Sequence, residues 1–296
     1  IWENEDPMEF RNSDGIGTGP FVLVSSTSQS QIFDRNEDWW AAKSGFQDLP
    51  KMKRIVYTPP GDINSSVARL INNEYDDGVV MSLGVFKAAR RRNPNIIAWD
   101  SDSSTPGASA ACLTTLGLNT KWGPMSDVNV RRGVQAAIDR DEISELAFEG
   151  SMVPQVVPYS TFPDLQAYQR QQQPIIDKYD PGANSPELVA QHMTAAGYAK
   201  DADGFWANGG ERLSVDMEVM SWLPHVMPVA EKQLRDAGFD VRSILHNPPD
   251  DQGLTKIRSG MSDLWIISHC GSSREPHGTL QNYHSKNRAP KQGKMN

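Results

Sequence analysis

Apolar and polar residues alternate along several short stretches of this chain, which is the pattern of half-buried strands. In residues 211–222, for example, Leu213, Val215, Met217 and Val219 fall on one face. The same kind of pattern predicts strands at 20–26, 30–40 (ending in a turn), 51–60, 110–120 and 211–222, and in the second parts of 62–80, 82–100, 228–245 and 253–268.

Between these strands, apolar residues recur at three- and four-residue spacing, which predicts amphipathic helices. The clearest helix lies at 126–148, where Ser126 or Asp127 caps a stripe that includes Val130 and Val134. Further helices are predicted at 185–198, with Ser185 as the cap, and in the first parts of 62–80, 82–100, 228–245 and 253–268.

The succession of helices and strands predicts an α/β fold in which helices pack on a sheet. The chain has 296 residues, of which 38% are hydrophobic, and this suffices for one large domain or two smaller ones. Neither an internal repeat nor a low-complexity linker interrupts the pattern.

The charge distribution argues against a nucleic-acid partner. The formal net charge is −8, and the cations form no stripe beyond residues 88–94, where they complement the end of a predicted helix. A surface that binds a duplex needs clustered cations. No run approaches the length of a membrane-spanning helix either.

The chemistry-bearing residues leave several interpretations of Cys270 open. The chain has two cysteines, Cys112 and Cys270, and it lacks the spacing of a structural zinc site, so no metal or other cofactor is expected. Cys270 could be a nucleophile, half of a disulfide or a packed core residue. The adjacent His269 cannot serve as its base, because neighbours in a strand point to opposite faces.

Four tryptophans fall at or near predicted strand ends, where ligand crevices form in open α/β sheets. Each could stack on a ligand or could cover the edge of the core. These tryptophans are Trp39, Trp40, Trp122 and Trp222. Residue patterns alone therefore predict a soluble α/β protein without an evident active site.

Four motifs occur in an order that resembles a known family. They are GTGPF at 17–21, RNEDWW at 35–40, the segment 118–143 with its Asp-Val-x-Val-Arg and Ala-Ile-Asp-Arg sequences, and the units at 231–241 and 259–267. This set resembles the extracellular solute-binding proteins of family 5, the dipeptide- and oligopeptide-type substrate receptors of ABC importers.

The resemblance implies an α/β, two-lobed, periplasmic-binding-protein-like fold of type II, in the large cluster with an extra domain. It implies a partial chain, in which residues 1–110 are a portion of lobe one and residues 111–296 are lobe two, incomplete at its C-terminal end. Members of the family carry a signal or lipoprotein peptide, and the resemblance implies that the given chain begins after this segment. The expected location is extracytoplasmic, either periplasmic or as a cell-surface lipoprotein.

The resemblance also implies a disulfide. Oligopeptide-binding relatives join a cysteine in the strand that matches 110–115 to one in the strand that matches 267–273, and Cys112 and Cys270 stand at these two places. An extracytoplasmic compartment would permit the bond. The chain-entropy model gives it about 4–5 kcal/mol of stabilisation at most.

One departure from the family pattern concerns the ligand. Peptide-binding relatives place an aspartate two residues beyond this cysteine to hold the amino terminus of the ligand, and Ser272 stands there instead. Of the basic residues that would meet the carboxylate of a peptide, only Arg258 remains nearby. Burying a peptide ammonium without a carboxylate partner is unfavourable. Serine, asparagine and tryptophan suit a neutral polyol, and oligosaccharide receptors exist within this family.

The expected function is that of the substrate-binding component of an ABC importer, which captures a polar solute between two lobes without chemistry. An oligosaccharide is favoured, a di- or oligopeptide is the alternative, and a hydrolase that uses Cys270 is a remote one. The expected partners are the solute and a membrane permease, and the chain is expected to be a monomer. The expected ligand contacts are Ser82, Trp222, His269, Cys270, Gly271, Ser272 and Ser273.

Overall fold

The computed structural model describes residues 17–59, 61–77, 82–103, 112–246 and 252–294, and every structural statement below concerns these residues. The chain divides into two compact units, Ile1–Met81 and Ser82–Asn296, which are treated separately. The predicted lobe boundary at 110/111 lies outside the described residues and stays a prediction, as does the predicted strand at the end of 62–80.

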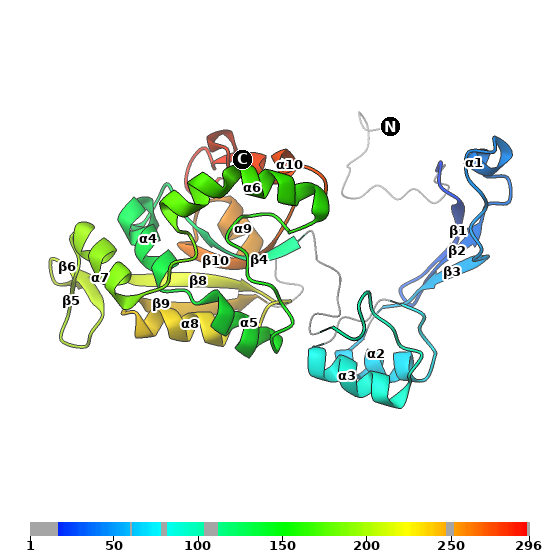
Figure 1. Ribbon diagram of the computed structural model, residues 1–296, viewed down its shortest axis with the longest axis horizontal. Coiled ribbons are helices and arrows are strands. Elements are labelled where there is room, and N and C mark those ends of the chain that lie inside the picture. The colour runs from blue at the N-terminus through cyan, green and yellow to red at the C-terminus, as the bar shows by residue number, and fades with distance from the viewer. Residues whose placement is uncertain (1–16, 60, 78–81, 104–111, 247–251, 295–296) are drawn as a thin grey trace. The chain divides into compact units, whose positions relative to one another are not determined.

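The first unit contains an antiparallel sheet in the order β1-β2-β3 (Figure 1), which confirms the strand predictions in this region. The predicted strand at 30–40 is shorter than expected, because the Asn36 side chain accepts a hydrogen bond from the Asp38 amide and turns the chain. Trp40 then begins a short helix. The elements are β1 (Phe21–Ser26), β2 (Gln31–Arg35), α1 (Trp40–Lys43), β3 (Arg54–Tyr57) and α2 (Ile63–Ile71).

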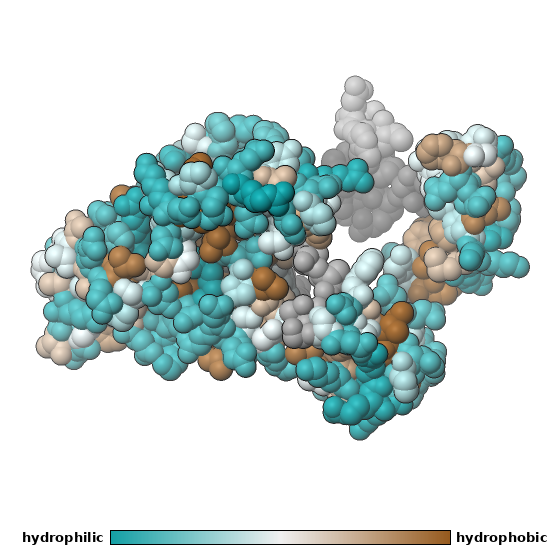
Figure 2. All heavy atoms as spheres, viewed as in Figure 1, coloured by the Kyte–Doolittle hydropathy of each residue, from teal (hydrophilic) through white to brown (hydrophobic). Residues whose placement is uncertain are grey.

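Many apolar side chains of the first unit are exposed. Brown patches lie over its strands in Figure 2. Trp39 is buried, and its indole donates to the Thr18 carbonyl oxygen at 2.9 Å, so a small core exists around the turn. The exposed apolar residues on the strands are Val22, Leu23, Val24, Val56 and Tyr57.

The second unit is built on a four-stranded sheet in the order β4-β10-β8-β9 (Figure 1). Strands β10, β8 and β9 are parallel, and β4 runs antiparallel to β10. The carboxyl ends of the three parallel strands therefore lie at the same edge as the start of β4. The strands are β4 (Cys112–Leu118), β8 (Ser214–Met220), β9 (Asp240–His246) and β10 (Leu264–Cys270).

Helices cover this sheet and close its core. Met217 and Leu264 are fully buried in the sheet, and they belong to one cluster with Val134 of α4, Leu234 of α8 and the loop residue Phe239. The helices of this unit are α3 (Leu83–Arg92), α4 (Val128–Ala136), α5 (Arg140–Phe148), α6 (Pro163–Tyr179), α7 (Pro186–Ala195), α8 (Met227–Asp236), α9 (Gln252–Arg258) and α10 (His277–Leu280), with short 3-10 turns at Pro124–Ser126, Gln281–Tyr283 and Ser285–Asn287.

Two expectations for this unit are wrong. The single helix expected at 126–148 is two helices, because the Asp139 side chain accepts from the Glu142 amide at 2.9 Å and starts α5 anew. The strand expected near residues 95–100 does not form. The Asn93 side chain accepts from the Asn95 amide there, and this turn ends the helix without a strand beside it.

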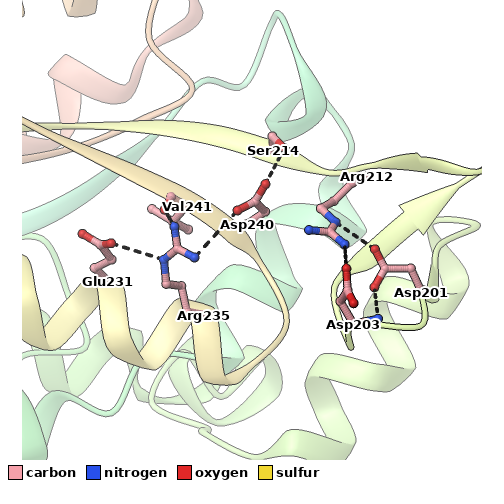
Figure 3. A network of polar contacts seen from close by, with 8 residues as sticks. All are labelled: Asp201, Asp203, Arg212, Ser214, Glu231, Arg235, Asp240 and Val241. Atoms are coloured by element: carbon pink, nitrogen blue, oxygen red, sulfur yellow. Dashed lines mark hydrogen bonds and ion pairs between the residues drawn. The ribbon is translucent and has the colours of Figure 1, made fainter.

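Arginine side chains link neighbouring elements of this unit by ion pairs and hydrogen bonds (Figure 3). Arg212 bridges Asp201 and Asp203, which closes a small sheet of β5 (Ala199–Lys200), β6 (Trp206–Asn208) and β7 (Glu211–Arg212). Arg235 on α8 donates to the Val241 carbonyl oxygen at 2.6 Å and so links that helix to β9. The charges are partly exposed, so each pair contributes little by itself.

Candidate functional site

The carboxyl edge of the sheet brings most of the predicted ligand contacts together. We define it as the segment after β8, the last residues of β10 with the loop that follows, and the start of β4. Because β8 and β10 are parallel and adjacent, Trp222 just beyond β8 and His269 near the end of β10 lie at this edge. Crevices at the carboxyl ends of parallel strands are the usual ligand sites of open α/β sheets.

Cys112 and Cys270 are joined by a disulfide across this edge, as predicted. The register of β4 and β10 places the two residues directly opposite each other, and the S–S distance is 2.00 Å. The bond spans 158 residues of sequence and fixes the start of β4 to the end of β10. Because Cys270 holds no free thiol here, it cannot act as a nucleophile in this state.

Trp222 presents a half-exposed indole at the edge. Its ring nitrogen donates to the Ser268 hydroxyl at 3.0 Å, and the residue is 51% exposed. The hydrogen bond fixes the ring at one end while much of its surface stays open. An indole held in this way can stack on a ligand without first losing conformational freedom.

His269 lies on the opposite face of β10 from Ser268 and belongs to a second polar and aromatic group. Its ring is 5.2 Å from that of Tyr283, and Nδ1 lies 3.4 Å from the Tyr283 hydroxyl. The Asn282 amide nitrogen is 3.3 Å from Nε2. Burial lowers the pKa of the His269 imidazole, so the ring is mostly neutral at pH 7. The sequence pattern did not identify Tyr283 or Asn282, since no motif marks them.

Hydrogen bonds between the Ser272 side chain and nearby backbone amides fix the loop after Cys270. The Ser272 hydroxyl accepts hydrogen bonds from the amides of Arg274 at 3.2 Å and Glu275 at 3.3 Å. A Cβ at Gly271 would lie only 1.7 Å from the Thr279 hydroxyl oxygen, so this position requires glycine. Ser272 thus shapes the loop and keeps its hydroxyl hydrogen for another acceptor.

Two further predicted ligand contacts are the serines Ser273 and Ser82. Ser273 is exposed in the loop beside Ser272. Ser82 caps α3, where its hydroxyl accepts from the Val85 amide at 3.4 Å, and the structure does not place it with the carboxyl edge. The role of Ser82 in ligand binding stays a prediction.

A buried charged group lies inside the sheet near the same edge. The Glu218 side chain of β8 is only 2% exposed and contacts the His246 imidazole at the end of β9. Lys256 of α9 donates to the other Glu218 oxygen at 3.0 Å. This group links two strands and a helix. Among the described residues, no set of three or more histidine, cysteine, aspartate or glutamate side chains could hold a metal ion.

Comparison with known proteins identifies the family of the chain. A family model described as the middle part of the bacterial extracellular solute-binding proteins, family 5, matches residues 2–291. The di/tripeptide-binding protein 2 of Pseudomonas aeruginosa is 24% identical over 274 residues, which cover 91% of this chain and 45% of that protein.

Solved structures show the same fold at low sequence identity. The periplasmic oligopeptide-binding protein of an oligopeptide ABC transporter from Thermotoga maritima has a TM-score of 0.80 and 21% identity, over 99% of this chain and 55% of its own. A mannohexaose-bound structure of that protein has a TM-score of 0.74 and 22% identity, over 95% of this chain and 52% of its own. This chain thus spans about half the length of the proteins that it matches.

Proposed function

Because the chain belongs to the bacterial extracellular solute-binding proteins of family 5, we propose that it supplies the substrate-binding part of an ABC importer. It captures a polar solute at the carboxyl edge without chemical change, and the solute is an oligosaccharide rather than a peptide. The observation that carries this proposal is the neutral character of three side chains at the strand ends of this edge. Trp222, Ser268 and His269 offer an indole face, a hydroxyl and a mostly neutral imidazole.

Neutral polyols are recognised by hydroxyl hydrogen bonds and by aromatic platforms, and this edge supplies both. A peptide brings two charged termini that need partners of opposite charge when they are buried. Ser272 stands where an aspartate would meet the ammonium group, and its hydroxyl already accepts two backbone hydrogen bonds. The mannohexaose bound to one structural neighbour supports the same ligand class.

A di- or oligopeptide is the second candidate, and two observations favour it. The matched Pseudomonas aeruginosa protein is a di/tripeptide-binding protein. The loop after Cys270 also carries Arg274 and Glu275, whose charges could meet the termini of a peptide. The Glu275 carboxylate already accepts from the Gly278 amide at 3.2 Å, which limits its use for a ligand.

The proposed partner beyond the solute is the membrane permease of the importer, and the proposed location is extracytoplasmic. The Cys112–Cys270 disulfide suits such a compartment, where disulfides persist. In the part of the chain that the structure describes, no helix is both long and apolar enough to cross a membrane. We propose that the receptor acts as a monomer.

Calorimetric titration of this chain with mannohexaose and, separately, with a tripeptide and a nonapeptide tests the proposal. Saturable binding of the oligosaccharide alone is expected. Tighter binding of a peptide would show that the solute is a di- or oligopeptide, the second candidate. Failure of both classes to bind a chain that shows native near-ultraviolet circular dichroism would contradict solute capture by this edge.

A further inference from the structure

A second aromatic ring lies exposed at the carboxyl edge. Tyr283 ends the 3-10 turn Gln281–Tyr283 that follows α10, and it is 59% exposed. The centroids of the Tyr283 and His269 rings are 5.2 Å apart, and their planes are inclined by 61°. This contact holds Tyr283 from one side and leaves much of its surface open, so the ring can stack on a ligand.

The contacts with His269 fix the position of this ring. The Tyr283 hydroxyl lies 3.4 Å from Nδ1 of the imidazole, and the Asn282 amide nitrogen lies 3.3 Å from Nε2. Both imidazole nitrogens therefore have a neighbour from the same turn, which fixes that turn to the end of β10. A phenol and an amide are uncharged at pH 7 and can exchange hydrogen bonds with hydroxyl groups. Tyr283 and Asn282 thus extend the set of neutral side chains at this edge.

Tyr283 and Trp222 lie on opposite sides of β10. Ser268 and His269 are successive residues of that strand, so their side chains point to opposite faces of the sheet. Trp222 donates to the Ser268 hydroxyl at 3.0 Å on one face, whereas Tyr283 contacts His269 on the other. The strand and these two side chains separate the two aromatic rings. One sugar ring therefore cannot stack on both, whereas a chain of sugar units can reach both.

The strand end between the two rings is uncharged. β10 ends at Cys270, which is exposed and is joined to Cys112 in the disulfide. Gly271 follows without a side chain, and the hydroxyl of Ser272 accepts hydrogen bonds from two backbone amides of its own loop. A neutral solute can cross this strand end without the free-energy cost of burying an unpaired charge.

We propose that Tyr283 contacts the solute as a second aromatic platform, so that the solute is a linear oligosaccharide of at least two sugar units. One unit stacks on Trp222 and another stacks on Tyr283, and the sugar chain crosses the end of β10 at Cys270. The proposal rests on the function proposed above, and it adds a minimum length of the solute and the residue that determines this length.

Calorimetric titration of this chain with mannose, mannobiose and mannohexaose tests the proposal. We expect mannobiose and mannohexaose to bind more tightly than mannose, because only the longer sugars can occupy both rings. Tyr283→Ala should weaken the binding of mannohexaose about tenfold, which corresponds to the loss of one aromatic contact. The same variant should change the binding of mannose much less, because mannose can still occupy Trp222.

Three further variants separate a contact with the solute from a structural role. Tyr283→Leu keeps an apolar side chain beside His269 but has no flat ring, so it should bind mannohexaose as weakly as Tyr283→Ala does. Tyr283→Phe keeps the ring and loses only the hydroxyl, so it should bind nearly as well as the wild type. Tyr179 at the end of α6 is 57% exposed, and Tyr179→Ala should bind normally. Native near-ultraviolet circular dichroism of each variant is the check on folding.

Several results would overturn the proposal. Normal binding of mannohexaose by Tyr283→Ala would exclude the ring from the site. Normal binding by Tyr283→Leu would show that Tyr283 only covers His269. Equal affinity of the wild type for mannose and mannohexaose would show that one sugar unit fills the site. In each of these cases the proposed function stands, whereas failure of all three sugars to bind the folded chain would overturn that function and this proposal together.

Discussion

Under the proposed function, single side chains at the carboxyl edge contact the solute. Trp222 is fixed by Ser268 and open on its face, and His269 is surrounded by Tyr283 and Asn282. Trp222 and His269 could be predicted as candidates from the sequence because they stand at strand ends. Asn282 and Tyr283 could not, since their contacts with His269 arise only when the chain folds.

Replacement of Trp222 by alanine tests its role as a stacking platform. We expect Trp222→Ala to weaken solute binding about tenfold, which corresponds to the loss of one aromatic contact, and Trp222→Phe to weaken it less. Titration calorimetry measures both. Trp99, which is 87% exposed, provides the matched control, since Trp99→Ala should bind normally. Unchanged binding by Trp222→Ala would remove the tryptophan from the site.

Two histidines make stability depend on pH. Burial lowers the pKa of the imidazoles of His225 and His269 in the folded protein, so the unfolded chain binds protons more readily than the folded chain. Stability should therefore be greatest above the ordinary imidazole pKa of about 6.5 and should fall as the pH drops through it. Urea unfolding of the wild type and of the His225→Asn, His269→Asn double variant measures the effect.

The double variant should lose less stability on acidification than the wild type does. The exposed His277 supplies a control, because His277→Asn should follow the wild-type pH dependence closely. The same slope in all three proteins would show that neither imidazole contributes.

At the scale of elements, hydrophobic patterning located all four strands of the second sheet. It predicted neither the break at Asp139 nor the small sheet of β5, β6 and β7. Asp139 was available as a capping residue, but the apolar stripe continues across the break. Near Trp99 the apolar pattern predicted a strand that does not form. A strand needs a neighbouring strand for its backbone hydrogen bonds, and this segment has none among the described residues.

The contact between β4 and β10 supplies a prediction at this scale. Gly117 lies directly opposite Trp265, and a Cβ there would lie 2.1 Å from the indole nitrogen. Gly117→Ala should therefore lower the free energy of unfolding by about 1–3 kcal/mol, because the ring or the strand must move. Urea unfolding measures the loss. Gly19→Ala has open space around the added methyl group and should be close to neutral. A neutral Gly117→Ala would show that Trp265 can move at little cost.

At the scale of the whole molecule, resemblance of motifs predicted the family, the fold class and the disulfide, whereas composition and periodicity reached only an α/β fold. The reason is physical, because many sequences satisfy the same pattern of burial and only specific loops carry function. The division into compact units at Met81/Ser82 depends on contacts that no local pattern contains.

The disulfide provides a prediction for the stability of the second unit. Replacing Cys112 and Cys270 together by serine should lower the free energy of unfolding by up to about 4–5 kcal/mol, because the closed loop is long. Reductant should have a similar effect on the wild type and none on the double serine variant. Unfolding curves with and without reductant measure this, and a thiol titration of the unfolded, unreduced protein should find no free thiol. Equal stability of reduced and oxidised wild type would contradict the prediction.

The pairing of β4 with β10 also has a consequence for how the protein is made. The two cysteines are separated by 158 residues, and synthesis proceeds at about 5–20 residues per second, so β4 leaves the ribosome roughly 8–30 s before its partner. During that interval neither edge of β4 can pair within the described sheet, because β10 has not yet been made. Nascent chains should therefore be most prone to aggregate in this window, and a chaperone that shields extended segments should raise the yield of folded protein.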